Sequence, residues 1–306
     1  TALSASGKFL YLWELSSGSC VRGFTGHTDQ VTAVALSRET ALSASLDGTV
    51  RLWSLASGEC LEVYRLNDPI ARLGVSISGL FLASSADKLI LARVARPDPL
   101  HTVPLSGPVC VAVSRDGRLA VTGSEEADSL RLWRLPATTF SRPWRAPRAH
   151  PEALGSGPST RQTVTAALAL SGDGRYVMVG DAEGWLRLFD VDEGWCRSFW
   201  QAHTQGVRSV RLSGDGRVAF SAFLAGSVSC WDVVSGRRLA TLPGPYEAIS
   251  MTPEGRFLLT AGVDKILRLW ELDWELNPQK EATPLADSWK KSTVLEMIGG
   301  FFRRKS

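Results

Sequence analysis

A nine-residue segment, SLDGTVRLW at Ser45 to Trp53, recurs along the whole chain in recognisable variants. The variants end at Trp13, Ala92, Trp133, Phe189, Trp231 and Trp270. Measured from Trp13 through Trp53 to Trp270, the steps are 40, 39, 41, 56, 42 and 39 residues. A fixed period of about 40 residues is typical of a repeat architecture, and six intervals indicate seven units.

The interior of each unit distinguishes a helical repeat from a repeat made of strands. Apolar runs of about six residues, such as VTAVAL at Val31 and TVRLWSL at Thr49, are separated by Asp-Gly and Ser-Gly turns. Runs this short with a two-residue period favour strands over helices. The sequence therefore predicts an all-β chain in which each unit is a four-stranded antiparallel sheet.

These features resemble the WD40 repeat family, whose members fold as seven-bladed β-propellers. The resemblance covers roughly residues 1–272 and is strongest around Gly26-His27. The literal Trp-Asp pair occurs once, at Trp231-Asp232, and the other units are degenerate. The resemblance implies blades near residues 1–24, 31–65, 70–105, 108–146, 163–201, 206–242 and 246–272.

Both ends of the expected propeller are incomplete. The chain begins in what would be the second strand of the first blade, and Asn277-Pro278 argues against a regular outer strand in the last one. We therefore expect a fragment or isoform of a longer protein. In the tail, residues 273–306, the spacing of Val294, Leu295, Ile298 and Phe302 favours a short helix, with a disordered terminus as the other simple interpretation. The alternative is an outer strand over residues 292–297.

Composition agrees with an intracellular, cytoplasmic or nuclear binding domain. The sequence has no apolar run of about 18 residues and no signal segment. Its five cysteines are odd in number, fall in expected strands and form no C-x-x-C pair. They are therefore interpreted as small buried hydrophobes, and neither as disulfides nor as metal ligands. We expect no metal and no cofactor.

The charge argues against a nucleic-acid partner, because a formal net charge of +3 is too small to indicate one. Much of the basicity lies in the tail, at Lys290, Lys291, Arg303, Arg304 and Lys305. A solvated basic end is the simpler interpretation, and a weak membrane-surface contact through this tail is the alternative.

The family resemblance implies a hydrogen-bond network in the second blade. In it, Asp47 faces His27, His27 meets the hydroxyl of Ser45, and that hydroxyl accepts from the indole of Trp53. A Ser, a His and an Asp also suggest nucleophilic catalysis, but the resemblance gives this set a structural role. The expected innermost strands, among them VTAVAL and VRSVRL, carry no Asp, Glu or His. A propeller enzyme with an acid–base or metal cluster in its channel is therefore disfavoured.

The longest step, 56 residues, locates an inserted loop at residues 141–162. It carries Trp144 beside Arg145, with Arg148 nearby, and Trp and Arg are the side chains that most often dominate interfaces. The arginines favour an acidic or phosphorylated peptide. A disordered excursion rich in Pro and Gly is the alternative.

By resemblance, other partner contacts would come from the loops on the same face. The residues expected there are Gln30, Leu46, Ala86, Ala182, Gln205, Leu224, Glu247 and Val263. The chain is thus expected to be a non-catalytic scaffold or adaptor that binds partner proteins or peptides. The alternative is the sensor or regulatory propeller of a larger signalling protein.

Overall fold

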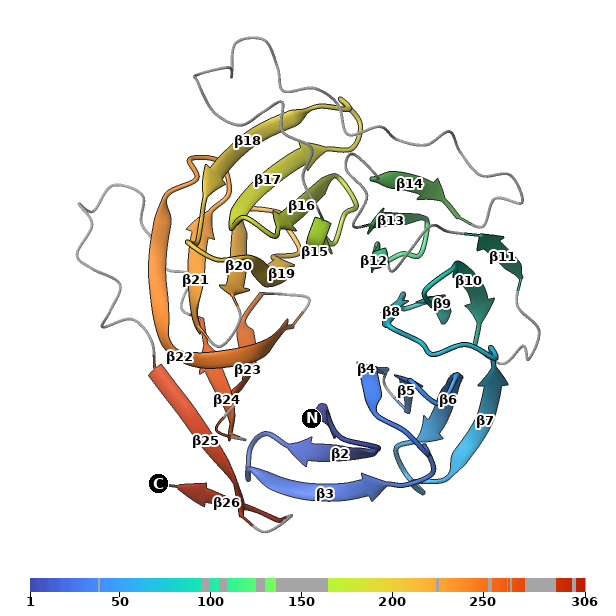
Figure 1. Ribbon diagram of the computed structural model, residues 1–306. Helices are drawn as coiled ribbons and strands as arrows, with labels where there is room; N and C mark the ends of the chain where they lie inside the picture. Colours follow the sequence, from blue (N-terminus) through green and yellow to red (C-terminus); the bar gives the residue numbers. More distant parts are fainter. Residues whose placement is uncertain are drawn as a thin grey trace. The chain divides into compact units, whose positions relative to one another are not determined.

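The structure of the protein is a computed structural model, and its strands are labelled in Figure 1. It describes residues 1–37, 39–94, 100–104, 109–124, 130–135, 165–223, 226–252, 255–262, 264, 266–272, 290–298 and 301–305. Within these ranges every regular element is a β-strand, which confirms the all-β class predicted from the short alternating runs. The chain divides into two units, residues 1–144 and residues 145–306.

Unit 1 contains antiparallel sheets in which each strand pairs with its neighbours in sequence. The first sheet has β1 (Ala2–Ser6), β2 (Phe9–Glu14) and β3 (Ser19–Phe24). The second has β4 (Val31–Leu36), β5 (Thr40–Ser45), β6 (Thr49–Ser54) and β7 (Cys60–Arg65). The third has β8 (Arg72–Val75), β9 (Leu80–Ser84), β10 (Lys88–Arg93) and β11 (His101–Pro104). The fourth has β12 (Val109–Val113), β13 (Leu119–Ser124) and β14 (Arg131–Arg134).

The first strands of the last three sheets in unit 1, β4, β8 and β12, are neighbours (Figure 1). Tight hairpin turns connect several of the described strands. Gly48, at φ 76° between β5 and β6, adopts a left-handed conformation that glycine accepts without steric cost. The Asp-Gly signal in the recurrent segment therefore marks a hairpin, as the sequence predicts.

Unit 2 contains one four-stranded and one eight-stranded sheet among its described residues. The first has β15 (Thr165–Leu170), β16 (Tyr176–Asp181), β17 (Trp185–Asp190) and β18 (Cys196–Gln201). The second begins with β19 (Val207–Leu212), β20 (Val218–Phe223), β21 (Gly226–Asp232) and β22 (Arg238–Met251). It continues with β23 (Phe257–Gly262), β24 (Ile266–Glu271), β25 (Lys290–Ile298) and β26 (Phe301–Lys305).

Strand β22 corrects the expected number of separate blades. Seven sheets are expected from the repeats, whereas the described strands form six, because β22 serves two repeats in succession. Its first half pairs with β21 and its second half with β23, and Tyr246 pairs with both Gly226 and Gly262. Residues 25–30 connect two sheets in unit 1, but only residues 243–245 occupy the corresponding place here. The shorter connection continues as one strand.

The C-terminal tail corrects a second expectation. Strand β25 pairs antiparallel with β24, from Ile266 opposite Glu296 to Glu271 opposite Lys290, and β26 pairs with β25. The helix considered for residues 273–306 is therefore wrong for the described part of the tail, and the outer-strand alternative is confirmed. The edge of β24 offers unpaired backbone groups to the tail. The spacing of the apolar residues in the tail carries no information about that edge, so it suggested a helix.

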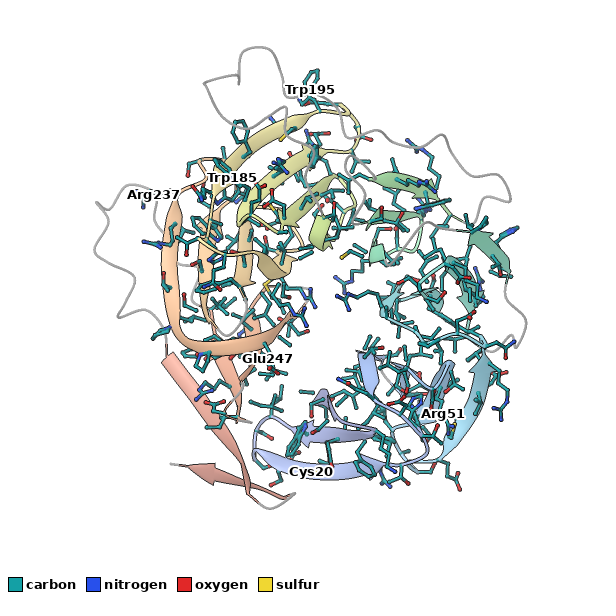
Figure 2. The ribbon with its side chains drawn as sticks, in the orientation of Figure 1. Cys20, Arg51, Trp185, Trp195, Arg237 and Glu247 are labelled. Carbon is teal, nitrogen blue, oxygen red and sulfur yellow. The ribbon has the colours of Figure 1, made fainter. Side chains whose placement is uncertain are left out.

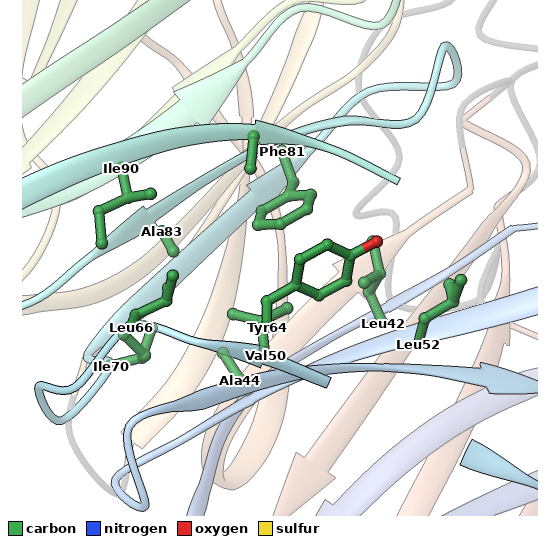
Figure 3. Close-up of a cluster of buried hydrophobic side chains, with 11 residues drawn as sticks. Leu42, Ala44, Val50, Leu52, Tyr64, Leu66, Ile70, Phe81, Ala83 and Ile90 are labelled. Carbon is green, nitrogen blue, oxygen red and sulfur yellow. The ribbon is translucent and has the colours of Figure 1, made fainter. Parts of the chain in front are cut away.

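Apolar side chains from neighbouring sheets interlock within each unit. In unit 1, Leu42, Val50 and Tyr64 of the second sheet pack with Phe81 and Ile90 of the third (Figure 3). The rings of Tyr64 and Phe81 meet edge to face, with their centroids 5.2 Å apart. Each such buried side chain stabilises the fold by about 1.5–3 kcal/mol. The contacts between sheets thus supply a core that no single sheet has alone.

In unit 2, close approach of the sheets depends on Gly180 in β16. A Cβ atom added there would lie 2.5 Å from Cγ1 of Val207 and 3.0 Å from Cγ2 of Val210. Both valines belong to β19, the first strand of the next sheet. Since atoms at 2.5 Å overlap, only glycine lets β19 pack directly on β16.

Candidate functional site

The tryptophan that ends the recurrent segment is a buried anchor in the sheets where it occurs. Its indole nitrogen donates a hydrogen bond of 2.8–3.0 Å to a hydroxyl on the neighbouring strand. The pairs are Trp13 with Ser4, Trp53 with Ser43, Trp133 with Thr122, Trp231 with Ser221, and Trp270 with Thr260. A hydroxyl nine to eleven residues before the tryptophan is thus a second repeating signal in the sequence.

In the second sheet of unit 1, a chain of hydrogen bonds continues from this anchor. The Trp53 indole donates to Oγ of Ser43 at 2.8 Å, and the same Oγ lies 2.7 Å from Nε2 of His27. On the other side of the imidazole, Nδ1 lies 2.7 Å from Oδ2 of Asp47. Because Ser43 accepts the indole proton, its own proton is donated to Nε2 of His27. A neutral imidazole that donates from Nδ1 to Asp47 satisfies the whole chain.

The network corrects one predicted member, because Ser43 takes the place expected for Ser45. Both serines lie on the same face of β5, since side chains alternate along a strand. Trp53 pairs with Ala41 in the ladder, so its indole reaches the diagonal neighbour Ser43. The Ser45 hydroxyl donates to the carbonyl of Asp29 at 3.0 Å. It therefore helps to hold the loop before β4.

Burial and hydrogen bonding set the charges in the network. Burial lowers the pKa of His27, and the Asp47 carboxylate offsets only part of that effect. Burial alone would raise the pKa of Asp47, but hydrogen bonds from Thr49, His27 and the Thr28 amide lower it to about 2. Near neutral pH a neutral His27 therefore faces an ionised Asp47. Every side-chain polar atom of this hydrogen-bond network has a partner within it or in the adjacent turn, which supports a structural role for the network.

A double-mutant cycle tests the corrected member. We expect Ser43 and Trp53 to be coupled by about 0.5–3 kcal/mol, because each substitution removes the same hydrogen bond. The cycle combines Ser43→Ala with Trp53→Phe, and urea unfolding measures the free energy of each variant. The control cycle combines Ser45→Ala with Trp53→Phe and should give additive losses. Equal coupling in the two cycles would contradict the assignment of Ser43.

Unit 2 contains a shortened form of the network. His203 Nε2 lies 2.7 Å from Oγ of Ser221, which accepts from the Trp231 indole at 2.8 Å. Among the residues with described positions, no carboxylate forms an ion pair with this imidazole. Burial, together with the positive charge of Arg238, lowers the pKa of His203 to about 4. His203 is therefore neutral over a wider pH range than an exposed histidine.

His203 should make the stability of the protein depend on pH. Its ordinary pKa of 6.5 applies in the unfolded chain, and the folded value is about 4. Between these values the unfolded state binds more protons, so the contribution to stability is complete above about pH 6.5 and is lost as the pH falls towards 4. We expect His203→Gln to reduce the dependence of the unfolding free energy on pH in this window, as measured by urea unfolding. His27 is present in both the unmodified protein and the variant. An unchanged dependence of the unfolding free energy on pH would therefore exclude His203 as its source.

Another repeat of unit 2 pairs its buried carboxylate with an arginine, whereas the second sheet of unit 1 pairs Asp47 with a histidine. Arg187 Nη1 lies 3.1 Å from Oδ2 of Asp181, whose side chain is 1% exposed. The other carboxylate oxygen of Asp181 accepts from the amides of Glu183 and Trp185, both at 2.9 Å. Arg187 stands two residues before Phe189, the terminal aromatic of its repeat. The ion pair thus joins β17 to the end of β16.

The last repeat uses an arginine in the same way. Arg268, two residues before Trp270, contacts Asp264 in the turn that precedes β24. Its guanidinium also lies over the ring of Tyr246, 5.8 Å from the centroid. The sequence analysis missed both arginines, although the repeated Arg-Leu before the terminal aromatic was a signal for them.

The predicted partner-binding residues that are described lie at one end of the sheets. Here the connection into a first strand meets the turn between the second and third strands, and we call this the loop end of each unit. In unit 1 the amide of Leu46 donates to the carbonyl of Gln30 at 2.9 Å. In unit 2 a Cβ on Gly206, next to Gln205, would lie 2.8 Å from the carbonyl oxygen of Ala182. The structure therefore brings these residues together in pairs, with their side chains exposed.

Two further predicted residues are also exposed. Ala86 lies in the turn between β9 and β10, and Glu247 occupies a β-bulge in β22, where it is labelled in Figure 2. The remaining predicted residues lie outside the described part of the chain. They are Trp144, Arg145, Arg148, Leu224 and Val263, together with the inserted loop at residues 141–162. The role of all these residues in binding stays a prediction.

A search for metal-binding chemistry was limited to the described ranges. Within them no group of three or more His, Cys, Asp or Glu side chains is arranged to hold a metal ion. No helix in the same ranges is long and apolar enough to cross a membrane.

The antiparallel meanders and their buried Trp–hydroxyl pairs define a protein built from β-propeller blades. Residues 18–54, 194–232 and 236–271 match the family model "WD domain, G-beta repeat". Each match takes the last strand of one blade and the first three of the next, as in β3 to β6. The chain therefore contains WD repeats in these three segments.

Several curated proteins are similar to this chain. It is 27% identical over 239 residues to Autophagy-related protein 16 of Arabidopsis thaliana, which covers 74% of this chain and 44% of that protein. It is 28% identical over 131 residues to THO complex subunit 6 of Arabidopsis thaliana, covering 40% and 35%. It is 29% identical over 141 residues to Pre-mRNA-processing factor 19 of Bos taurus, covering 43% and 28%. The matched region spans less than half the length of each relative.

Proposed function

We propose that this chain is a protein-interaction scaffold or adaptor without catalytic activity of its own. Partner proteins or peptides bind at the loop end of its units. The observation that carries this proposal is the pairing of exposed loop residues on a fixed frame, as in the 2.9 Å bond from the Leu46 amide to the Gln30 carbonyl. A loop backbone that is already held by a rigid scaffold loses little further entropy when a partner binds.

The arrangement of the Ser, His and Asp side chains supports a non-catalytic role. The hydroxyl of Ser43 is buried, accepts from Trp53 and bonds His27. A nucleophilic serine needs an accessible oxygen and space for a reacting carbonyl beside it. Here that space is filled by the indole and the imidazole.

The similar proteins give general support to an interaction role. The name of THO complex subunit 6 places that relative in a multiprotein complex. An alternative is that the chain acts as the sensor or regulatory propeller of a larger protein, because its match covers only 44% of Autophagy-related protein 16. Both readings share a partner-binding loop end and differ in what the propeller is attached to.

Site-specific crosslinking tests where partners bind. The photoreactive residue p-benzoylphenylalanine would replace Leu46, which is 37% exposed at the loop end of unit 1. The matched control places it at Ile77, which is 72% exposed in the turn before β9, at the opposite end of the sheets. We expect partner crosslinks from Leu46 and not from Ile77. Equal crosslinking from both, or crosslinks from Ile77 alone, would contradict the loop-end proposal.

The inserted loop needs its own test. Arginines beside a tryptophan would suit an acidic or phosphorylated peptide. A pull-down should therefore compare the unmodified chain with the double variant Trp144→Ala, Arg145→Ala. We expect the variant to lose the partners that crosslink to Leu46. Retention of all of them would remove this loop from the binding surface.

A further inference from the structure

Strand β19 is the first strand of its sheet in unit 2. It carries two arginines among apolar residues. Its ladder with β20 shifts register between Val207 and Ser209, so Arg208 occupies a β-bulge. Bulges re-aim a side chain and are enriched beside functional sites. Arg208 is exposed, and Arg211 is half-buried.

The alternation of β19 places Arg211 on a defined face. Val207, Val210 and Leu212 pack in one apolar cluster with β16 and β17. Arg211 is paired with Phe220, which belongs to the other cluster, together with Ile249 of β22. The Arg211 side chain therefore leaves the strand on the side of β22. Strands β15, β19 and β22 are neighbours along this edge of the unit (Figure 1).

The positive charge of Arg211 has no anionic partner among the described residues. Its Nη1 donates to the carbonyl of Val210, the preceding residue, at 2.8 Å. Burial lowers the pKa of Arg211, and no neighbouring carboxylate opposes that effect in the described ranges. A desolvated, unpaired charge is costly, so such groups are normally paired.

Two further polar side chains on this strand, Arg208 and Ser209, are candidates to share an anion with Arg211. Arg208 also forms no ion pair with the part of the chain that is described. The half-buried Ser209 lies on the same face as Arg211, two residues away, and its hydroxyl makes no hydrogen bond within the described ranges. The neighbouring charge is Glu247, exposed at the bulge of β22 (Figure 2). Neither β15 nor the stretch of β22 from residue 248 to 251 carries a charged side chain.

We propose that Arg208, Ser209 and Arg211 on β19 form a binding site for a single phosphate group. Guanidinium groups match the geometry of phosphate oxygens and bond them in pairs. Donors from two arginines and one hydroxyl suit a tetrahedral anion better than a planar carboxylate. The apolar surroundings of Arg211, with Phe220 and Ile249 close by, strengthen its attraction for a negative charge.

The proposed site lies on a first strand and shares only Glu247 with the loop-end residues used above. Because phosphate binding is measured with small anions and no partner protein, its failure is distinguishable from failure of the crosslinking test. The phosphate group can be a free ion or part of a phosphorylated side chain. The structure assigns the group and not its carrier. Glu247 reduces the positive charge of the site, since two arginines and one carboxylate leave a net charge of about +1. The carboxylate should therefore weaken the binding of an anion.

Titration with defined small anions tests the site. Inorganic phosphate, O-phosphoserine and acetate would each be added to the full chain while the side-chain N–H resonances of arginine are followed by NMR. We expect saturable shifts of the Arg211 signal with both phosphate compounds and weaker shifts with acetate. A stronger response to O-phosphoserine than to phosphate would assign the group to a modified side chain, and the reverse would assign it to the free ion.

Variants decide whether Arg211 is responsible. Arg211→Gln should weaken phosphate binding about tenfold or more, and Glu247→Gln should strengthen it, because one attraction and one repulsion are removed. Arg211→Lys should retain part of the affinity, which controls for misfolding. Arg217→Gln is the matched control, since Arg217 is 83% exposed and faces Asp215 in its own turn. Phosphate binding that is non-saturable, unchanged in Arg211→Gln, or equally weakened by Arg217→Gln would overturn the proposal.

Discussion

Replacing Trp53 with alanine is expected to lower the free energy of unfolding by about 3–5 kcal/mol. The side chain is 1% exposed, and its ring lies 5.8 Å from Phe24 and 6.0 Å from the His27 ring, both edge to face. The substitution removes this packing and leaves a cavity between two sheets of unit 1. It also removes the indole donor from Ser43, so the hydrogen-bond chain to Asp47 loses its first member.

Urea unfolding monitored by circular dichroism measures this loss. Trp195→Ala is the matched control, because Trp195 is 38% exposed in the connection between β17 and β18 (Figure 2). We expect the control to cost much less, since little buried surface is lost. Similar losses for the two tryptophans would mean that Trp53 is not an anchor of the blade.

The second large effect is expected at the buried ion pair of unit 2. Arg187→Ala should cost about 3–5 kcal/mol, because it leaves the Asp181 carboxylate buried without a counter-charge. The side chains of Arg187 and Asp181 are 12% and 1% exposed, respectively. The loss thus arises from an unpaired charge more than from the energy of the contact itself.

A surface pair in the same unit provides the comparison. Arg217 and Asp215 are 83% and 61% exposed, so water solvates Asp215 when its partner is removed. We expect Arg217→Ala to leave the urea midpoint unchanged. A loss for Arg187→Ala as small as that of Arg217→Ala would show that Asp181 is solvated or paired in another way.

Much of the fold could be predicted from local patterns. The period of about 40 residues, the two-residue alternation and the Asp-Gly turns act within one repeat, so they specify strands and hairpins without knowledge of the neighbours. The network of His27, Asp47 and Trp53 was implied by the family resemblance that these local motifs carry. The predicted loop-end residues came from the same resemblance, which assigns them to the connection before a first strand or to the turn between the second and third strands.

The features that were predicted wrongly depend on contacts between strands or sheets. The choice of Ser43 over Ser45 depends on the register of β5 against β6, which pairs Trp53 with Ala41. The strand that replaced the expected helix in the tail depends on the free edge of β24. Neither quantity is encoded in the order of polar and apolar residues.

The sequence by itself determined that this protein is a repeat of four-stranded units, because strand period and turn chemistry are local properties of the backbone. Only the tertiary structure decided that β22 joins two repeats in one sheet, that Arg187 reaches Asp181, and that Arg211 lies beside Phe220 with no carboxylate partner among the described residues. In each case the statement concerns partners within the described residues, and the outcome depends on which residues face each other across strands and sheets. Packing determines which of the side chains at equivalent repeat positions form these contacts.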